Sequence, residues 1–132
     1  MIARFYLESR PGEEGAVLQL PVSRLNINVN PKPVVVETDI ATAELVQVKL
    51  GWCLVFRLTP PAVRDFYRMS VGAQGRRLVL TLNGQPIGAR RFDQAIADGG
   101  LLMFLEVLDT DLPVIADRVR QTSESLAAHA KH

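Results

Sequence analysis

Four arginines around one predicted hairpin are the residues best suited to chemistry. Arg76 and Arg77 begin the first strand of this hairpin, and Arg90 and Arg91 end the second. Residues 83–84 between the strands are Asn-Gly, which is typical of a type I′ turn because both turn residues need positive φ. A two-residue turn sets Arg77 opposite Arg90 and Arg76 opposite Arg91. Guanidinium groups gathered in this way are suited to binding an anion or an acidic partner.

Like charges that face each other across a hairpin are destabilising, so these arginines need neutralising partners. By sequence order, Asp93 and Glu106 are the nearest carboxylates for this role. Two interpretations stay open, namely arginines tied into surface salt bridges and a functional anion site. Nucleic acid is not expected as the partner, because only 6% of the residues are aromatic and no stacking platform accompanies the arginines.

Trp52 and Cys53 lie where a second hairpin is predicted to turn, near Gly51. An indole at such a corner either anchors a partner or closes one end of the core. Cys53 alternates away from the predicted core side chains Leu54 and Phe56. A single cysteine excludes an internal disulfide framework, and neither a cation nor a helix N-terminus is predicted beside it. We therefore expect the thiol to be an inert, small apolar side chain.

The composition argues against an enzyme. Both histidines, His129 and His132, fall at the C-terminal end, so no general base is expected among the ordered elements. The carboxylates lack the spacing of a calcium loop, and residues 72–75 lack the Lys-Ser/Thr of a phosphate-binding loop. We predict no catalytic residues, no metal site and no cofactor. A net charge of +1 provides no overall field to attract nucleic acid or an anionic membrane.

Hydrophobic patterning predicts a single α+β domain, since 132 residues with 48% apolar content suffice for one core. We expect a mixed, mostly antiparallel sheet with two helices packed on one face. The predicted strands span residues 2–8, 16–20, 25–29, 44–49, 53–58, 77–82, 85–91 and 101–107, the last of them central because it is apolar on both faces.

Capping signals locate the two helices. The first begins at Pro60 with Thr59 as its N-cap and buries a face of Val63, Phe66, Tyr67 and Ser70. The second is capped by Thr110 and runs over about residues 111–127. The predicted organisation is thus a β-rich part over residues 1–50, a mixed part over 51–127, and a frayed tail over 128–132.

The stretch from about residue 53 to 100 resembles the head subdomain of the first periplasmic domain of the SecD/SecDF protein-export subunits. In that family a strand ending in Phe-x-Leu-Thr opens a helix, a Gly-Lys/Arg pair starts a strand, and an Asp/Asn-Gly turn leads to a strand of small residues. The matching positions here are Phe56, Leu58, Thr59, Gly75, Arg76, Leu78, Leu80, Gly84, Ala89, Ile96 and Gly99. Arg90 and Arg91 stand where the family has a proline.

The resemblance implies a free-standing, non-catalytic interaction domain that recognises a protein or peptide partner. It also implies a periplasmic or otherwise extracytoplasmic location. Residues 1–8, however, are too polar for a signal peptide, and the chain has no transmembrane segment. If the chain is complete, these two features predict a cytoplasmic location instead. The binding residues we predict are Arg76, Arg77, Arg90, Arg91 and Trp52, with an exposed sheet edge as another surface. The alternative is a small-anion or ligand-binding accessory domain that uses the arginine hairpin.

Overall fold

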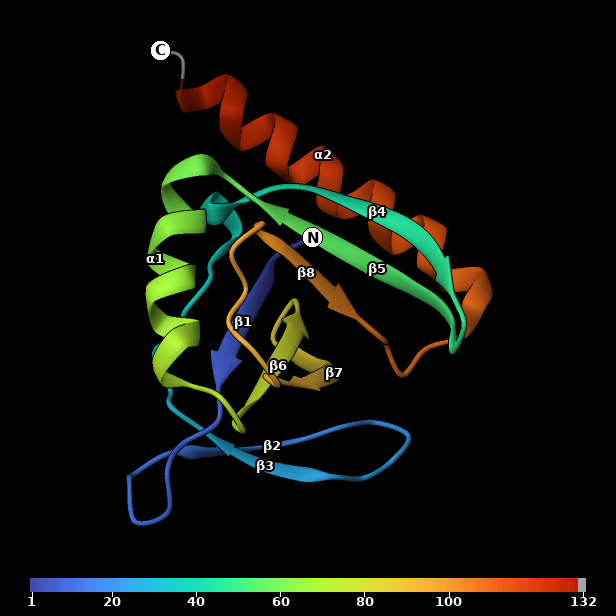
Figure 1. Ribbon diagram of the computed structural model, residues 1–132. Coiled ribbons are helices and arrows are strands. Elements are labelled where there is room, and N and C mark those ends of the chain that lie inside the picture. Colours follow the sequence, from blue (N-terminus) through green and yellow to red (C-terminus); the bar gives the residue numbers. More distant parts are fainter. Residues whose placement is uncertain (131–132) are drawn as a thin grey trace.

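The computed structural model, which describes residues 1–130, shows an α+β domain whose strands all pair antiparallel (Figure 1). The strands form three sheets, ordered β1-β6-β7, β2-β3 and β4-β5-β8, instead of the single sheet that the sequence suggested. The strands are β1 (Ala3–Leu7), β2 (Ala16–Gln19), β3 (Asn26–Val29), β4 (Ile40–Val48), β5 (Gly51–Leu58), β6 (Arg77–Leu82), β7 (Gln85–Arg91) and β8 (Gly100–Met103). The helices are η1 (Glu37–Asp39), α1 (Pro60–Gly72), η2 (Asp109–Asp111) and α2 (Leu112–Ala130).

The sheet β1-β6-β7 is the middle layer, because it buries side chains on both faces. On one face Phe5 and Leu80 join the main core, where the Phe5 ring meets the Phe56 ring of β5 edge to face at 5.3 Å. On the opposite face Val79 packs with Ile27 and Val29 of the β2–β3 hairpin in a second, smaller core. Side chains alternate between the two faces of this sheet, so it packs on the main core with one face and on the β2–β3 hairpin with the other.

The β6–β7 hairpin turns at Asn83 and Gly84, both at positive φ, as the Asn-Gly signal predicts. Its register differs from the prediction, because Leu80 faces Gly88 while Thr81 faces Pro86, which leaves Ile87 as an additional, bulged residue. The bulge coincides with a second chain segment at this edge, where the N–H of Glu106 donates to the carbonyl of Ile87 at 2.7 Å.

The expectation of a central strand over residues 101–107 is wrong. β8 spans only Gly100–Met103 and lies at the edge of its sheet. After Met103 the chain no longer pairs with β5. It forms a bridge to the other sheet instead, with Leu105 opposite Gly88 of β7. This segment is apolar on both faces because it contacts first the β4-β5-β8 sheet and then the β1-β6-β7 sheet.

Both predicted helices are present, with differences in their faces and ends. Thr59 is the N-cap of α1, although its hydroxyl makes no capping hydrogen bond. α1 buries Ala62, Phe66 and Ser70, whereas the expected Tyr67 is exposed. α2 continues to Ala130, beyond the predicted end at 127, and the remainder of the predicted frayed tail, residues 131–132, lies outside the described residues.

α2 lies along β4, at the outer edge of the β4-β5-β8 sheet (Figure 1). The Arg120 guanidinium donates to the backbone carbonyl of Ala43 in β4 at 3.1 Å. Leu112, Ile115 and Val119 extend from this helix into the main core. α2 thus protects an edge strand and adds to the core at once. Neither helix, within residues 1–130, is long and apolar enough to cross a membrane.

Candidate functional site

The structure brings Arg76 and Arg77 to Glu8, at the end of β1. The Arg77 guanidinium forms an ion pair with the Glu8 carboxylate at 2.7 Å, and the Arg77 N–H donates to the same carboxylate at 2.9 Å. The Arg76 guanidinium donates to the backbone carbonyl of Glu8, with its Nε at 2.8 Å. The carboxylates expected from sequence order, Asp93 and Glu106, are therefore not the partners, because β1 pairs with β6 and delivers Glu8 instead.

The bulged register sets Arg77 directly opposite Arg91, and Glu8 binds Arg77 from the β1 side of the sheet. The hydrogen bonds from Arg77 and the charges of Arg77 and Arg91 hold the pKa of the Glu8 carboxyl below its ordinary value, against the opposing effect of partial burial. Arg90 faces Leu78 in this register, not Arg77, and its guanidinium donates to the carbonyl of Leu102 in β8 at 3.3 Å. Three of the four arginines thus have partners inside the domain.

Trp52 lies beside the β4–β5 turn, opposite Gln47, and is partly exposed. Cys53 is fully buried, its thiol donates to the carbonyl of Val46 at 3.4 Å, and burial raises the pKa of this thiol. Trp52 belongs to the β4-β5-β8 sheet, whereas the arginine hairpin belongs to the β1-β6-β7 sheet.

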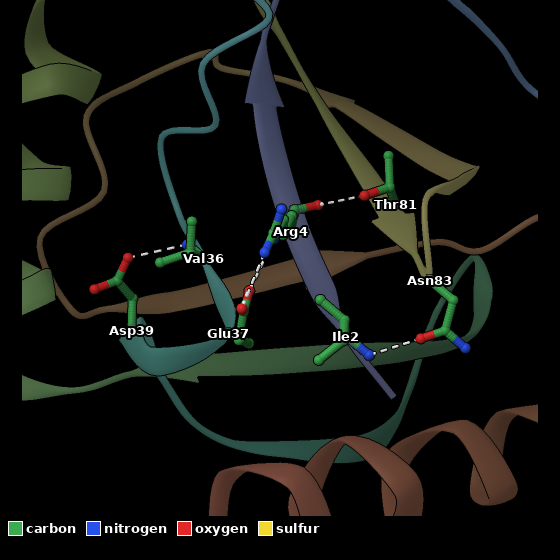
Figure 2. Close-up of polar contacts among 7 residues, drawn as sticks. All are labelled: Ile2, Arg4, Val36, Glu37, Asp39, Thr81 and Asn83. Carbon is green, nitrogen blue, oxygen red and sulfur yellow. Dashed lines mark hydrogen bonds and ion pairs between the residues drawn. The ribbon is translucent and has the colours of Figure 1, made fainter. Parts of the chain in front are cut away.

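Most sheet edges are covered by other parts of the chain. The outer edge of β1 receives residues 34–37, where Phe5 donates to the carbonyl of Val35 at 2.9 Å. Figure 2 shows this segment held in place, since the Arg4 guanidinium pairs with Glu37 at 2.9 Å and the N–H of Val36 donates to Asp39. On the other side, Thr81 of β6 donates to the carbonyl of Arg4 (Figure 2).

β2 differs from these strands, because its outer edge is open. Leu20 donates to the carbonyl of Leu25 at 3.0 Å, and antiparallel alternation from that pair directs the N–H and C=O groups of Val17 and Gln19 away from β3. Within residues 1–130, no hydrogen bond joins those backbone groups to another strand or side chain. The Val17 side chain is 66% exposed on the same strand. β2 can therefore accept a further strand.

An apolar groove of about 520 Å³ opens beside the tip of the β2–β3 hairpin. Its lining joins Val22 of the tip to Val107, Leu108 and Asp111 of the segment that leads into α2. Glu106, the remaining lining residue, fastens the two walls. Its carboxylate accepts from the N–H of Val22 at 2.9 Å, from the N–H of Ser23 at 2.7 Å and from the Ser23 hydroxyl at 2.8 Å.

These hydrogen bonds decide the charge of Glu106. Partial burial raises the pKa of its carboxyl, but the donors from Ser23 and Val22 outweigh burial and leave the pKa below its ordinary value. All three donors are uncharged, so they do not cancel the negative charge of Glu106. The groove therefore combines apolar side chains with a carboxylate in its lining.

No protein-family model matches this chain, and neither does any curated protein sequence. Its fold does match solved structures of SecDF. A crystal structure of SecDF in the super-membrane-facing form superposes with a TM-score of 0.70 at 22% sequence identity, over 90% of this chain and 18% of that one. The chain has a SecD-like fold. A second structure, of "a membrane component SecDF that enhances protein export", gives a TM-score of 0.69 at 23% identity, over 90% of this chain and 61% of that one.

A third SecDF structure, of the translocon-associated membrane protein from Thermus thermophilus, gives a TM-score of 0.56 at 22% identity over 91% of this chain and 20% of that one. The SecD-like chain thus spans less than two thirds of each of these SecDF chains. The match also extends beyond residues 53–100, on which the sequence resemblance rested, and includes most of the β-rich N-terminal part.

The sequence led us to expect an exposed sheet edge as one binding surface, but it indicated neither β2 as that edge nor the groove in this SecD-like fold. The open edge depends on which strands β2 and β3 meet, and no residue type marks an unpaired strand. One signal was available, since Val17, Val22 and Leu25 are apolar residues that interrupt the expected inward alternation of the hairpin, and all three are exposed.

Proposed function

We propose that this SecD-like domain is a non-catalytic module that binds an extended segment of a partner protein by adding it as a strand to β2. The observation that carries this proposal is the open outer edge of β2, with Val17 and Gln19 presenting backbone donors and acceptors. Strand addition gives affinity through main-chain hydrogen bonds, and side-chain sites along the strand give specificity. An extended segment of an unfolded protein satisfies this geometry without prior folding.

The fold supports a setting for this binding. The SecDF structures that this chain matches belong to membrane components described as enhancing protein export and as associated with the translocon. We propose by analogy that the domain acts outside the cytoplasm on polypeptides that are not yet folded. This step rests on the fold alone, and the strand-addition surface does not depend on it.

An anion or acidic partner at the arginine hairpin is the second candidate. Arg91 favours it, since this side chain is exposed and lies opposite Arg77. Against it, Glu8 lies beside both cations, and the Arg76 and Arg90 guanidinium groups already donate to backbone carbonyls. Binding at Trp52 would be a third, separate surface.

The decisive experiment compares Val17→Pro with Val17→Thr. Proline removes the outward N–H of residue 17 and keeps the pairing with β3, because that N–H has no partner in the hairpin. Threonine keeps the N–H and suits a strand. The probe is a permanently unfolded polypeptide, reduced and blocked with a neutral alkylating reagent, and its affinity and the amide NMR shifts of β2 are measured. We expect Val17→Thr to bind like the wild type and Val17→Pro to bind at least tenfold more weakly.

Salt dependence and an arginine variant separate the candidates. Strand addition should change little with ionic strength, whereas an anion site should weaken steeply as the salt concentration rises. Arg90→Glu combined with Arg91→Glu should leave binding at β2 unchanged. If Val17→Pro binds the unfolded polypeptide like the wild type and the arginine double variant does not bind it, the β2 proposal is rejected. That result would support binding at the arginine hairpin.

A further inference from the structure

The groove beside the β2–β3 tip gives the binding edge a chemical preference. Its walls carry two of the most exposed apolar side chains of the described residues, Val22 at 74% and Leu108 at 72%. They belong to different parts of the chain, and the hydrogen bond from Val22 to Glu106 joins these parts at the groove. A volume of about 520 Å³ lies within the range of sites that hold small apolar groups.

The groove is negatively charged. Glu106 and Asp111 line it, no lysine or arginine is among its lining residues, and no cation forms a salt bridge with either carboxylate within residues 1–130. Asp109, which precedes Asp111 in η2, adds a further exposed carboxylate nearby. Charge complementarity therefore favours an occupant that carries lysine or arginine beside its apolar group.

The groove lies close to the end of β2. Val22 belongs to the turn that joins β2 to β3 and stands three positions after Gln19, the last residue of β2. A segment paired along β2 therefore has one end close to the groove.

We propose that the groove selects extended segments of unfolded polypeptide in which a large apolar side chain is flanked by lysine or arginine. The apolar side chain lies between Val22 and Leu108, and the flanking cation meets Asp111 and Glu106. This inference rests on the proposed strand addition, because β2 determines where the segment lies and in which direction it runs.

The test uses three labelled peptides with one strand-forming, Thr- and Val-rich part and different ends. The ends are Lys-Leu-Lys, Glu-Leu-Glu and Lys-Ser-Lys, and affinity is measured for each on the intact chain. We expect the wild type to prefer Lys-Leu-Lys at least tenfold over either of the others. Leu108→Ser should remove the preference for Leu over Ser, and Asp111→Asn should reduce the preference for Lys over Glu. Both replaced side chains are exposed, so the fold should tolerate these variants.

The outcomes separate this inference from the function on which it rests. Equal binding of all three peptides, lost in Val17→Pro, would overturn the groove preference and leave strand addition intact. A preference that survives in Leu108→Ser and in Asp111→Asn would also overturn it. Failure of every peptide to bind would reject both, whereas a preference that needs Leu108 and Asp111 and disappears in Val17→Pro would support both.

Discussion

Glu8 ties the end of β1 to the start of β6, because its carboxylate binds Arg77 and its backbone carbonyl binds Arg76. The Arg77–Glu8 pair is only partly exposed, with side-chain exposures of 26% and 21%, so solvent screens it less than a surface pair. We expect Arg77→Ala to lower the free energy of unfolding by about 1 to 2 kcal/mol, since it leaves the Glu8 carboxylate without its charged partner. Chemical denaturation at neutral pH measures this loss.

The matched control is Arg91→Ala, because Arg91 faces Arg77 across the hairpin and is exposed. It should change the stability by less than about 0.5 kcal/mol. An equal loss in both variants would show that charge near the hairpin, and not the Arg77–Glu8 contact, is responsible.

The same pair predicts a pH dependence. The pKa of Glu8 is lower in the folded protein than its ordinary value of 4.5, so the unfolded state binds the proton more readily. The stabilisation is therefore fully present above that ordinary value and is lost as the pH falls through the lower folded pKa. We expect the stability difference between the wild type and Glu8→Gln to shrink as the pH falls below about 4.5. A difference that stays constant from pH 7 to pH 3 would contradict this assignment.

At the scale of elements, Gly88 fixes how β7 meets the segment that leaves β8. A Cβ added at residue 88 would lie 2.8 Å from the carbonyl oxygen of Phe104, which is backbone and cannot rotate away. We expect Gly88→Ala to lower the free energy of unfolding by about 1 to 3 kcal/mol, because the two sheets would have to separate locally. Gly72→Ala is the control, since nothing lies within 4 Å of its added Cβ and alanine favours the helix. Thermal unfolding of both variants compares them, and equal melting temperatures would contradict the argument.

The elements also show what local sequence can and cannot predict. The Asn83–Gly84 turn and the start of α1 at Pro60 follow from backbone preferences of a few residues, and both are confirmed. The register of the hairpin could not be read from local sequence, because the bulge at Ile87 occurs where Glu106, from a distant segment, donates its N–H to the Ile87 carbonyl. The partner of Arg76 and Arg77 was not predicted for the same reason, since strand pairing brings Glu8 to them over a long sequence separation.

At the scale of the whole molecule, the fold class and the SecD-like character were readable from the sequence, whereas the candidate surface was not. Alternation and capping depend on neighbours in the chain, so they predict α+β structure directly. An open strand edge is defined by the absence of a neighbour, and only the assembled sheets reveal it. The groove likewise is lined by two distant parts of the chain, and the hydrogen bond from Val22 to Glu106 joins them.

The two cores predict how the molecule opens. The β2–β3 hairpin is attached through a small core of Leu20, Ile27, Val29 and Val79, separate from the main core of the other sheets. Ile27 is only 1% exposed, so Ile27→Ala should cost about 2 to 4 kcal/mol through lost burial and a cavity. We expect this loss to appear first as local opening of the hairpin, with amide hydrogen exchange accelerated in β2 and β3 more than in β5.

Val119→Ala provides the comparison, because Val119 of α2 is buried in the main core. This variant should accelerate exchange in β4 and β5 together with the hairpin, since the main core supports the whole domain. Equal acceleration of β3 and β5 in Ile27→Ala would show that the two cores unfold as one unit. Faster exchange in the hairpin alone would instead mean that β2 can open locally while the main core stays folded. In that case Ile27→Ala should also weaken the binding of a partner segment at β2.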